Sequence, residues 1–263
     1  MFWTGYGGES SRTRDSLLGE GVMTELQTTW NWMIAVYLFL GGLGAGAACT
    51  VAIIGLAAGE RFKKTMVFGT WAAAIILALG ALLLLLDTAK PFRAMIMPIS
   101  FVNLGSWMAL GAWLLLVAIL LNGLSALFWT DWTLAWLGRL WKPFSEKRRV
   151  WRTVLAAVAL PVSLGVAVYT GILLGVLPFR PLWHTWLLPF LFTVSALDTG
   201  VALVTGHAFF REKGEGVGRL RMVLEISAIL LIVAEAVVLY LFVNTALTGS
   251  QDAARSAQVL TEG

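Results

Sequence analysis

The stretch Trp30 to Ala48, WNWMIAVYLFLGGLGAGAA, decides the fold of this chain. It lies in a longer run, from Glu25 to Glu60, whose interior contains no charged residue. About 20 apolar residues are enough for a helix to cross the ~30 Å hydrocarbon core of a bilayer. We therefore predict a membrane-spanning helix here, and the same pattern recurs along the rest of the chain.

Four residues within this stretch have specific expected roles. Trp32 lies near its start, where amphipathic rings favour the headgroup level of a membrane. Gly42 and Gly46 form a small-xxx-small pair that allows another helix to approach closely. The hydroxyl of Tyr37 needs a polar partner in an apolar environment, and either a neighbouring helix or a bound ligand would supply one.

The composition of the chain agrees with a membrane protein and excludes several other classes. Of 263 residues, 59% are hydrophobic and 13% are charged, as in polytopic membrane proteins. The single cysteine, Cys49, cannot build an iron–sulfur cluster or a cysteine zinc site. The net charge of +4 comes from cations that flank apolar spans, so we do not predict binding to nucleic acid.

We predict an all-α polytopic membrane protein, a helix bundle with six transmembrane helices. The spans are expected at about 31–58, 65–86, 101–121, 153–177, 184–209 and 222–247. An interfacial helix is expected at 123–144, where Trp and Leu share one stripe and cations crowd the end. The polar segment 1–29, which lacks the apolar region of a signal peptide, is expected to be partly disordered, and 248–263 form a polar tail.

Lys and Arg are distributed unequally between the two sides of these spans. The loops after the first, third and fifth spans carry thirteen of the 19 cations: Arg61, Lys63, Lys64, Arg139, Lys142, Lys147, Arg148, Arg149, Arg152, Arg211, Lys213, Arg219 and Arg221. The positive-inside rule then predicts a bacterial or archaeal cytoplasmic membrane protein with both termini on the periplasmic or outer side.

With that orientation, several polar residues are expected near the outer surface. They are Asn31, Trp32, Tyr37, Asp87, Arg93, Tyr169 and His184. Phenols, an imidazole and a carboxylate among aromatic rings suit a quinone, whose carbonyls need hydrogen-bond donors and, on reduction, protons. The alternative is an aromatic belt with loop polar groups that are satisfied locally.

Five motifs in one order resemble the NrfD / polysulfide reductase membrane-subunit family. The motifs are WNWMIAVYLFLGGLGAGA (30–47), LLDTAKPFRAM (85–95), SFVNLGSWMALGAW (100–113), YTGILLG (169–175) and PLWHTWLLPFLFTVSALDTG (181–200). The family usually reads DLGRP where this chain has DTAKP at 87–91. The resemblance covers nearly all of residues 30–247.

This resemblance implies a subunit that exchanges electrons with a membrane quinone, menaquinone or ubiquinone. The quinone pocket is expected between its first four helices. Tyr37 and Tyr169 match the family positions that contact the quinone head. It also implies an iron–sulfur partner with [4Fe–4S] clusters, which feeds a molybdopterin subunit or a multihaem cytochrome, so that no haem or cluster is expected in this chain. Relatives normally continue with at least two more spans. Here the remaining helices belong to another chain, or the sequence is truncated, or this member is shorter.

Four ionisable residues are predicted within the last two spans. Asp198 and Glu235 should lie near the midplane on antiparallel neighbours, where an ionised carboxylate is costly and therefore a functional candidate. With Glu225 and His207 they would form a path for protons. The plainer alternatives are a protonated Asp198 bonded to a neighbouring helix, and Glu225 and His207 facing headgroups.

Three other functions compete with quinone chemistry. A b-type haem needs two axial ligands on one iron, but His184 and His207 are 23 residues and ~35 Å apart on one helix. An ion transporter or channel would use the interior carboxylates as ion ligands, but we find no clear inverted repeat. A purely structural membrane anchor for a partner is the third alternative.

Overall fold

The computed structural model describes residues 32–87, 107–140, 147–175, 185–213 and 216–248. These residues form the helices α2 (Trp32–Ala58), η1 (Gly59–Phe62), α3 (Lys63–Asp87), α5 (Trp107–Trp129), α6 (Asp131–Leu140), α8 (Arg148–Gly175), α9 (Leu187–Arg211) and α10 (Val217–Thr248). All helices except η1 and α6 are long and apolar enough to cross a membrane, which makes six candidate spans in the described part of the chain. The prediction of an all-α polytopic membrane fold is therefore confirmed.

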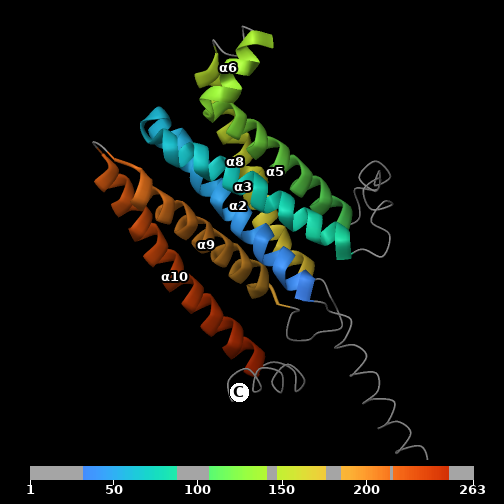
Figure 1. Cartoon of the computed structure of the whole chain (residues 1–263). Helices are drawn as coiled ribbons and strands as arrows, with labels where there is room; N and C mark the ends of the chain where they lie inside the picture. Colours follow the sequence, from blue (N-terminus) through green and yellow to red (C-terminus); the bar gives the residue numbers. More distant parts are fainter. Residues whose placement is uncertain (1–31, 88–106, 141–146, 176–184, 214–215, 249–263) are drawn as a thin grey trace, which may run out of the picture.

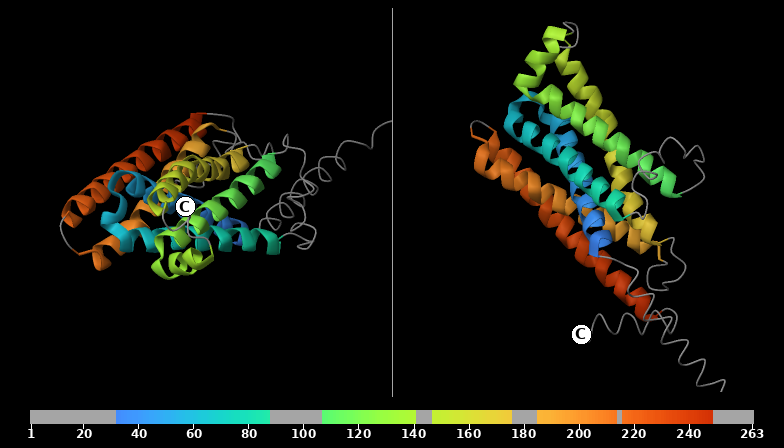
Figure 2. Two further views of the ribbon diagram at one scale, coloured as in Figure 1. Left: turned by 90° about the horizontal axis from the view of Figure 1, so that it is seen from above. Right: turned by 45° about the vertical axis from the view of Figure 1, so that its right-hand side comes forward.

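The six long helices run along one common direction, and α6 lies beyond one end of the bundle (Figure 1). Helix α2 is central, because it packs against α3, α8 and α9. In the most apolar 18-residue segment of α2, 72% of the residues are buried, whereas in the corresponding segment of α10 only 6% are. Helix α10 packs chiefly on α9 and lies at the outside of the bundle (Figure 2).

Small residues explain why α2 can occupy the centre. A methyl group added at Gly46 would overlap the carbonyl oxygen of Ala196 on α9 and would lie 3.2 Å from Cα of Gly200. One added at Gly42 would lie 3.3 Å from Cβ of Ala196. The two backbones are therefore in direct contact, and the predicted close approach at Gly42 and Gly46 is confirmed.

The third span differs from its predicted position. Helix α5 begins at Trp107 and continues to Trp129, and the residues 101–106 lie outside the described part. The separate helix begins at Asp131 instead of the predicted residue 123 and is described as far as Leu140, and residues 141–144 lie outside the described part. The difference has a physical reason: Phe128 and Trp129 are fully or almost fully buried against neighbouring helices, so they continue the span instead of lying on the membrane surface.

Charged residues join the helix ends at one end of the bundle. The buried Arg152 of α8 pairs with Glu60 of η1, donates hydrogen bonds from Nε and Nη2 to the carbonyl oxygen of Phe128 at 2.9 and 2.7 Å, and lies over the Trp129 ring. The carboxylate of Glu212, after α9, accepts a 2.8 Å hydrogen bond from the backbone N–H of Thr65 in the first turn of α3. We call this the basic end, because the described cations that follow the first, third and fifth spans lie there, among them Arg61, Arg148 and Arg211.

Candidate functional site

A cavity of about 110 Å³ lies between four helices, near the end of the bundle opposite the basic end. Its walls come from α2, α3, α5 and α8, and they include the two tyrosines that the sequence singled out. The lining residues are Tyr37, Leu38, Gly41, Gly80, Leu84, Gly111, Ala112, Leu115, Val166, Tyr169, Thr170 and Leu173. Tyr37 and Tyr169, 132 positions apart in the chain, therefore face one enclosed space.

The antiparallel arrangement of the helices explains why these residues meet. Tyr37 is five residues after the start of α2, and Tyr169 is six residues before the end of α8. At 1.5 Å of rise per residue, both are about 8–9 Å inside their helix ends. Leu84 and Gly111 are similarly close to the end of α3 and the start of α5. The cavity therefore lies within about two turns of one end of the bundle.

Glycines create the space that the tyrosines border. Gly41, Gly80 and Gly111 each contribute to the wall from a different helix. At Gly111 the fit is tightest, since a Cβ there would overlap the ring of Tyr169. Added methyl groups at Gly41 and Gly80 would make only ordinary contacts, at 3.5 Å or more. Gly111 therefore fixes the position of the Tyr169 ring, and this specific role was not predicted from the sequence.

The polar side-chain groups of the cavity are three hydroxyls, those of Tyr37, Tyr169 and Thr170. Thr170 donates its hydroxyl to the carbonyl oxygen of Ala167 at 2.7 Å, so its hydrogen bond stays within α8. The phenols of Tyr37 and Tyr169 are half-buried and are both able to donate or accept a hydrogen bond. The rest of the wall is aliphatic or glycine. Such a site suits a flat apolar ring that carries hydrogen-bond acceptors.

The size of the cavity agrees with the head of such a molecule. A dry protein cavity of about 150 Å³ holds a benzene ring, so 110 Å³ is of the order that one ring requires. A second hollow, of about 350 Å³, lies between α5 and α8 and is lined by apolar residues such as Leu110, Leu164 and Ile172. Tyr169 lines both spaces, and therefore stands between the enclosed cavity and this outer hollow.

The other predicted quinone contacts are not placed by the structure. Asn31, Arg93 and His184 lie outside the described residues. Trp32 and Asp87 are the first residue of α2 and the last residue of α3, at the same end as the cavity, but their side chains are outside the described part. Their roles remain predictions.

The structure brings two of the interior carboxylates together. Asp198 of α9 and Glu235 of α10 lie on helices that pack against each other, and both side chains are half-buried. Oδ1 of Asp198 is buried and has no hydrogen-bond partner among the described residues. An unsatisfied carboxyl oxygen inside an apolar bundle is unusual and points to a protonated side chain or an ordered water.

The other two members of the predicted proton path lie elsewhere. The ring of His207 stacks on Phe68 of α3, with centroids 4.0 Å apart and an interplanar angle of 4°. Its Nδ1 is buried without a hydrogen-bond partner in the described residues. Glu225 is exposed on α10. A proton path through all four residues remains a prediction.

No metal centre is found in the described ranges: they contain no group of three or more His, Cys, Asp or Glu side chains that could hold an ion. The walls of the two spaces around Tyr169 are aliphatic or glycine apart from the phenols, Thr170 and Pro161.

Comparisons with known proteins agree with this architecture. The family described as "Polysulphide reductase, NrfD" matches residues 22–263. The C component of the polysulfide reductase of Wolinella succinogenes is 32% identical over 244 residues, which cover 89% of this chain and 75% of that protein.

Two further relatives are more distant. The C component of the selenate reductase of Mesobacillus selenatarsenatis is 26% identical over 71% of this chain and 50% of its own length. Protein NrfD of Escherichia coli is 29% identical over 66% of this chain and 58% of its own length. Since the family match covers most of the sequence and one relative exceeds 30% identity over most of both proteins, the chain belongs to the NrfD family.

Proposed function

We propose that this chain binds a quinone from the bilayer and exchanges electrons between the quinone pool and an iron–sulfur partner. As a member of the NrfD family, with relatives that are subunits of polysulfide and selenate reductases, it is a membrane subunit of a respiratory oxidoreductase. The observation that carries the proposal is the single cavity into which Tyr37 and Tyr169 both face.

The residues of the cavity provide orientation and hydrogen bonding. Donation from the phenols to the two ring oxygens would hold the quinone head in place, while the aliphatic wall excludes water. The hollow between α5 and α8 offers the apolar tail a way to the lipid beside Tyr169. Oxidation of a quinol releases two electrons and two protons, and Asp87 and His184 are the proposed proton acceptors at this end of the bundle.

The electrons require a partner, since the resemblance to the family implies that the redox centres are carried by other subunits. We propose a docked [4Fe–4S] subunit near the cavity, which in turn serves a molybdopterin subunit or a multihaem cytochrome. The quinone is menaquinone or ubiquinone. We propose that the site and both termini face the periplasmic or outer side of the cytoplasmic membrane, since the basic end is then cytoplasmic.

Binding of a short-chain naphthoquinone to the purified chain in lipid nanodiscs tests this function. Tryptophan fluorescence quenching reports binding, and Tyr37→Phe and Tyr169→Phe should each weaken it roughly 3- to 10-fold, because each removes one hydrogen bond. Tyr240→Phe is the matched control, since Tyr240 is 70% exposed on α10, far from the cavity wall. Equal binding by all four proteins would exclude the cavity as the quinone site.

A second candidate activity, proton translocation coupled to quinone turnover, is favoured by the half-buried Asp198, whose Oδ1 has no hydrogen-bond partner among the described residues. A carboxylate pair near the midplane can share and pass on one proton at a lower cost than two separate charges. Asp198→Asn in the assembled complex, reconstituted in proteoliposomes, should abolish proton uptake while leaving quinone turnover intact. Unchanged proton uptake in this variant would remove Asp198 from any such path.

A further inference from the structure

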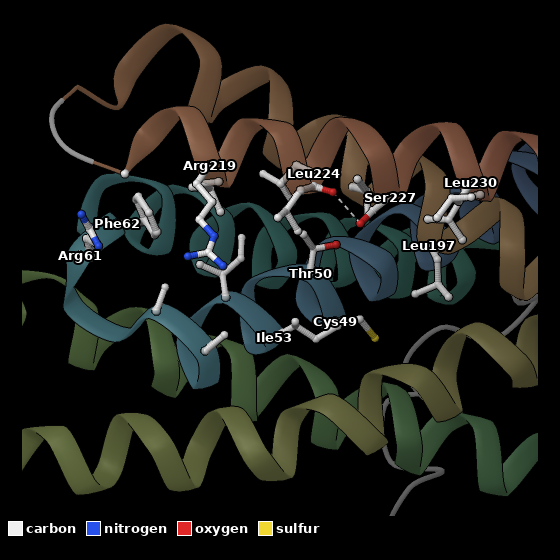
Figure 3. Close-up of a pocket in the computed structure, with 18 residues that line it drawn as sticks. Cys49, Thr50, Ile53, Arg61, Phe62, Leu197, Arg219, Leu224, Ser227 and Leu230 are labelled. Atoms are coloured by element: carbon white, nitrogen blue, oxygen red, sulfur yellow. Dashed lines mark hydrogen bonds between the residues drawn. The ribbon is translucent and has the colours of Figure 1, made fainter.

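A large cavity at the basic end is separate from the tyrosine-lined site. It has a volume of about 900 Å³ and lies between α2, α9 and α10. This is at the upper end of the range of about 300–1,000 Å³ for small-molecule pockets. Figure 3 shows Arg61 and Arg219 at one end of this space and Leu197 and Leu230 at the other.

The charged groups of the cavity are confined to its mouth. Arg61 follows α2 and Arg219 is in the first turn of α10, so both guanidinium groups lie at the basic end of the bundle. The guanidinium of Arg61 lies against Gly216, where an added Cβ would be 2.6 Å from Cζ. Guanidinium groups are the side chains best suited to bind a phosphate, and two of them line this mouth of the cavity.

The interior of the cavity is mostly apolar. Its wall consists mainly of branched aliphatic side chains: Ile53, Ile54, Leu197, Val201, Leu220, Val223, Leu224, Leu230 and Leu231. The two hydroxyl groups in it are satisfied by their own helices, Thr50 by the carbonyl oxygen of Gly46 at 2.9 Å and Ser227 by that of Val223 at 2.8 Å. A wall of this kind suits a bound hydrocarbon chain.

The length of the cavity corresponds to one leaflet of a bilayer. From Arg219 to Leu231 the wall on α10 extends over twelve residues, about 18 Å of helix. Half of the ~30 Å hydrocarbon core is about 15 Å. A molecule with its charge at the arginines would therefore reach the bilayer centre with an acyl chain.

The position of α10 gives such a molecule a structural role. Helix α10 packs chiefly on α9, and the cavity separates much of it from α2. We propose that this cavity is a binding site for an anionic phospholipid, whose phosphate is held by Arg61 and Arg219 and whose acyl chains fill the space between α2 and α10. The proposal is independent of the function of the tyrosine-lined cavity.

Retention of phosphatidylglycerol by the full-length chain tests the site. Native mass spectrometry after detergent washing should find bound phosphatidylglycerol, and added phosphatidylglycerol should raise the thermal unfolding temperature, whereas phosphatidylcholine and inorganic phosphate should not. The double variant Arg61→Gln/Arg219→Gln should weaken retention by roughly 30-fold, since each basic residue contributes about fivefold at an anionic membrane surface.

Two further variants distinguish binding in the cavity from a general effect of positive charge at this end of the protein. Arg211→Gln/Lys213→Gln removes the same charge at the same end from exposed residues outside the cavity wall, and it should retain lipid like the wild type. Ala57→Phe keeps both arginines but places a phenyl ring in the part of the cavity near them, and it should reduce retention.

Three results would each overturn the proposal. Equal retention by the wild type, the arginine variant and Ala57→Phe would show that the cavity holds no lipid. Protection by phosphatidylcholine as strong as that by phosphatidylglycerol would show that the arginines do not select a charge. The same stabilisation by inorganic phosphate alone would indicate a site for a free anion.

Discussion

Gly111 allows the relation between packing and the proposed function to be tested directly. In the structure a methyl group at this position would overlap the ring of Tyr169. Gly111→Ala therefore leaves two outcomes: either the tyrosine keeps its place and α5 and α8 separate, or the ring turns away. Overpacking of a core of this kind costs about 1–3 kcal/mol. Displacing the ring instead removes its hydrogen bond to the ligand, which weakens binding roughly 3- to 10-fold.

The measurement combines thermal unfolding with naphthoquinone binding in nanodiscs. Gly111→Ala should lower the unfolding temperature or bind quinone as weakly as Tyr169→Phe does. Gly123→Ala is the matched control, because Gly123 lies on the same helix and an added Cβ there meets no atom within 4 Å. That variant should resemble the wild type in both assays.

A double-mutant cycle identifies the cause. In a Tyr169→Ala background the ring that obstructs the new methyl group is gone, so Gly111→Ala should have almost no further effect on stability. The reasoning is refuted if Gly111→Ala alone changes neither property, or if its cost is the same with and without the Tyr169 ring.

Three further predictions concern the stability of the bundle, and each is checked by thermal unfolding in detergent. Arg152→Ala should destabilise the protein by about 2–4 kcal/mol, because a buried guanidinium with two hydrogen bonds to a backbone carbonyl and an ion pair is lost; a Tm equal to the wild type would contradict this. Gly200→Val should separate α2 from α9, since even a Cβ at Gly200 overlaps the backbone of Gly46, and it should cost at least about 1–3 kcal/mol; tolerance would show that the contact is not tight. Lys63 lies 2.5 Å from Asp131 and lowers the pKa of that carboxyl group, so the pair stabilises the fold above the unfolded pKa of about 3.9 and its contribution is lost as the pH falls through the lower folded value. Lys63→Met should therefore reduce the Tm at pH 7 slightly and no longer do so at pH 2, and an equal effect at both pH values would contradict the linkage.

Much of the fold could be predicted from local sequence, because a bilayer imposes simple demands. A long uncharged run such as that containing residues 32–58 forms a helix, since a single segment satisfies its own backbone hydrogen bonds in hydrocarbon only as a helix. The small-xxx-small pair of Gly42 and Gly46 indicated a close helix contact, because two glycines four residues apart lie on one face of a helix and leave room for a neighbouring backbone. The end of α5 was not predictable in this way. A tryptophan such as Trp129 is compatible both with a membrane span and with a helix on the membrane surface, and only its neighbours in the fold distinguish the two.

The sequence by itself determined the membrane-spanning helices, their alternating directions and the candidate tyrosines, because each depends on hydropathy, length and residue type. Only the tertiary structure decided that Tyr37 and Tyr169 share one cavity, that Gly111 holds the second ring in place and that His207 packs on Phe68. These facts depend on the rotation of each helix about its axis and on which helices become neighbours. Apolar residues surround most of each helix, so the sequence carries little information on either, and packing between small and large side chains settles both.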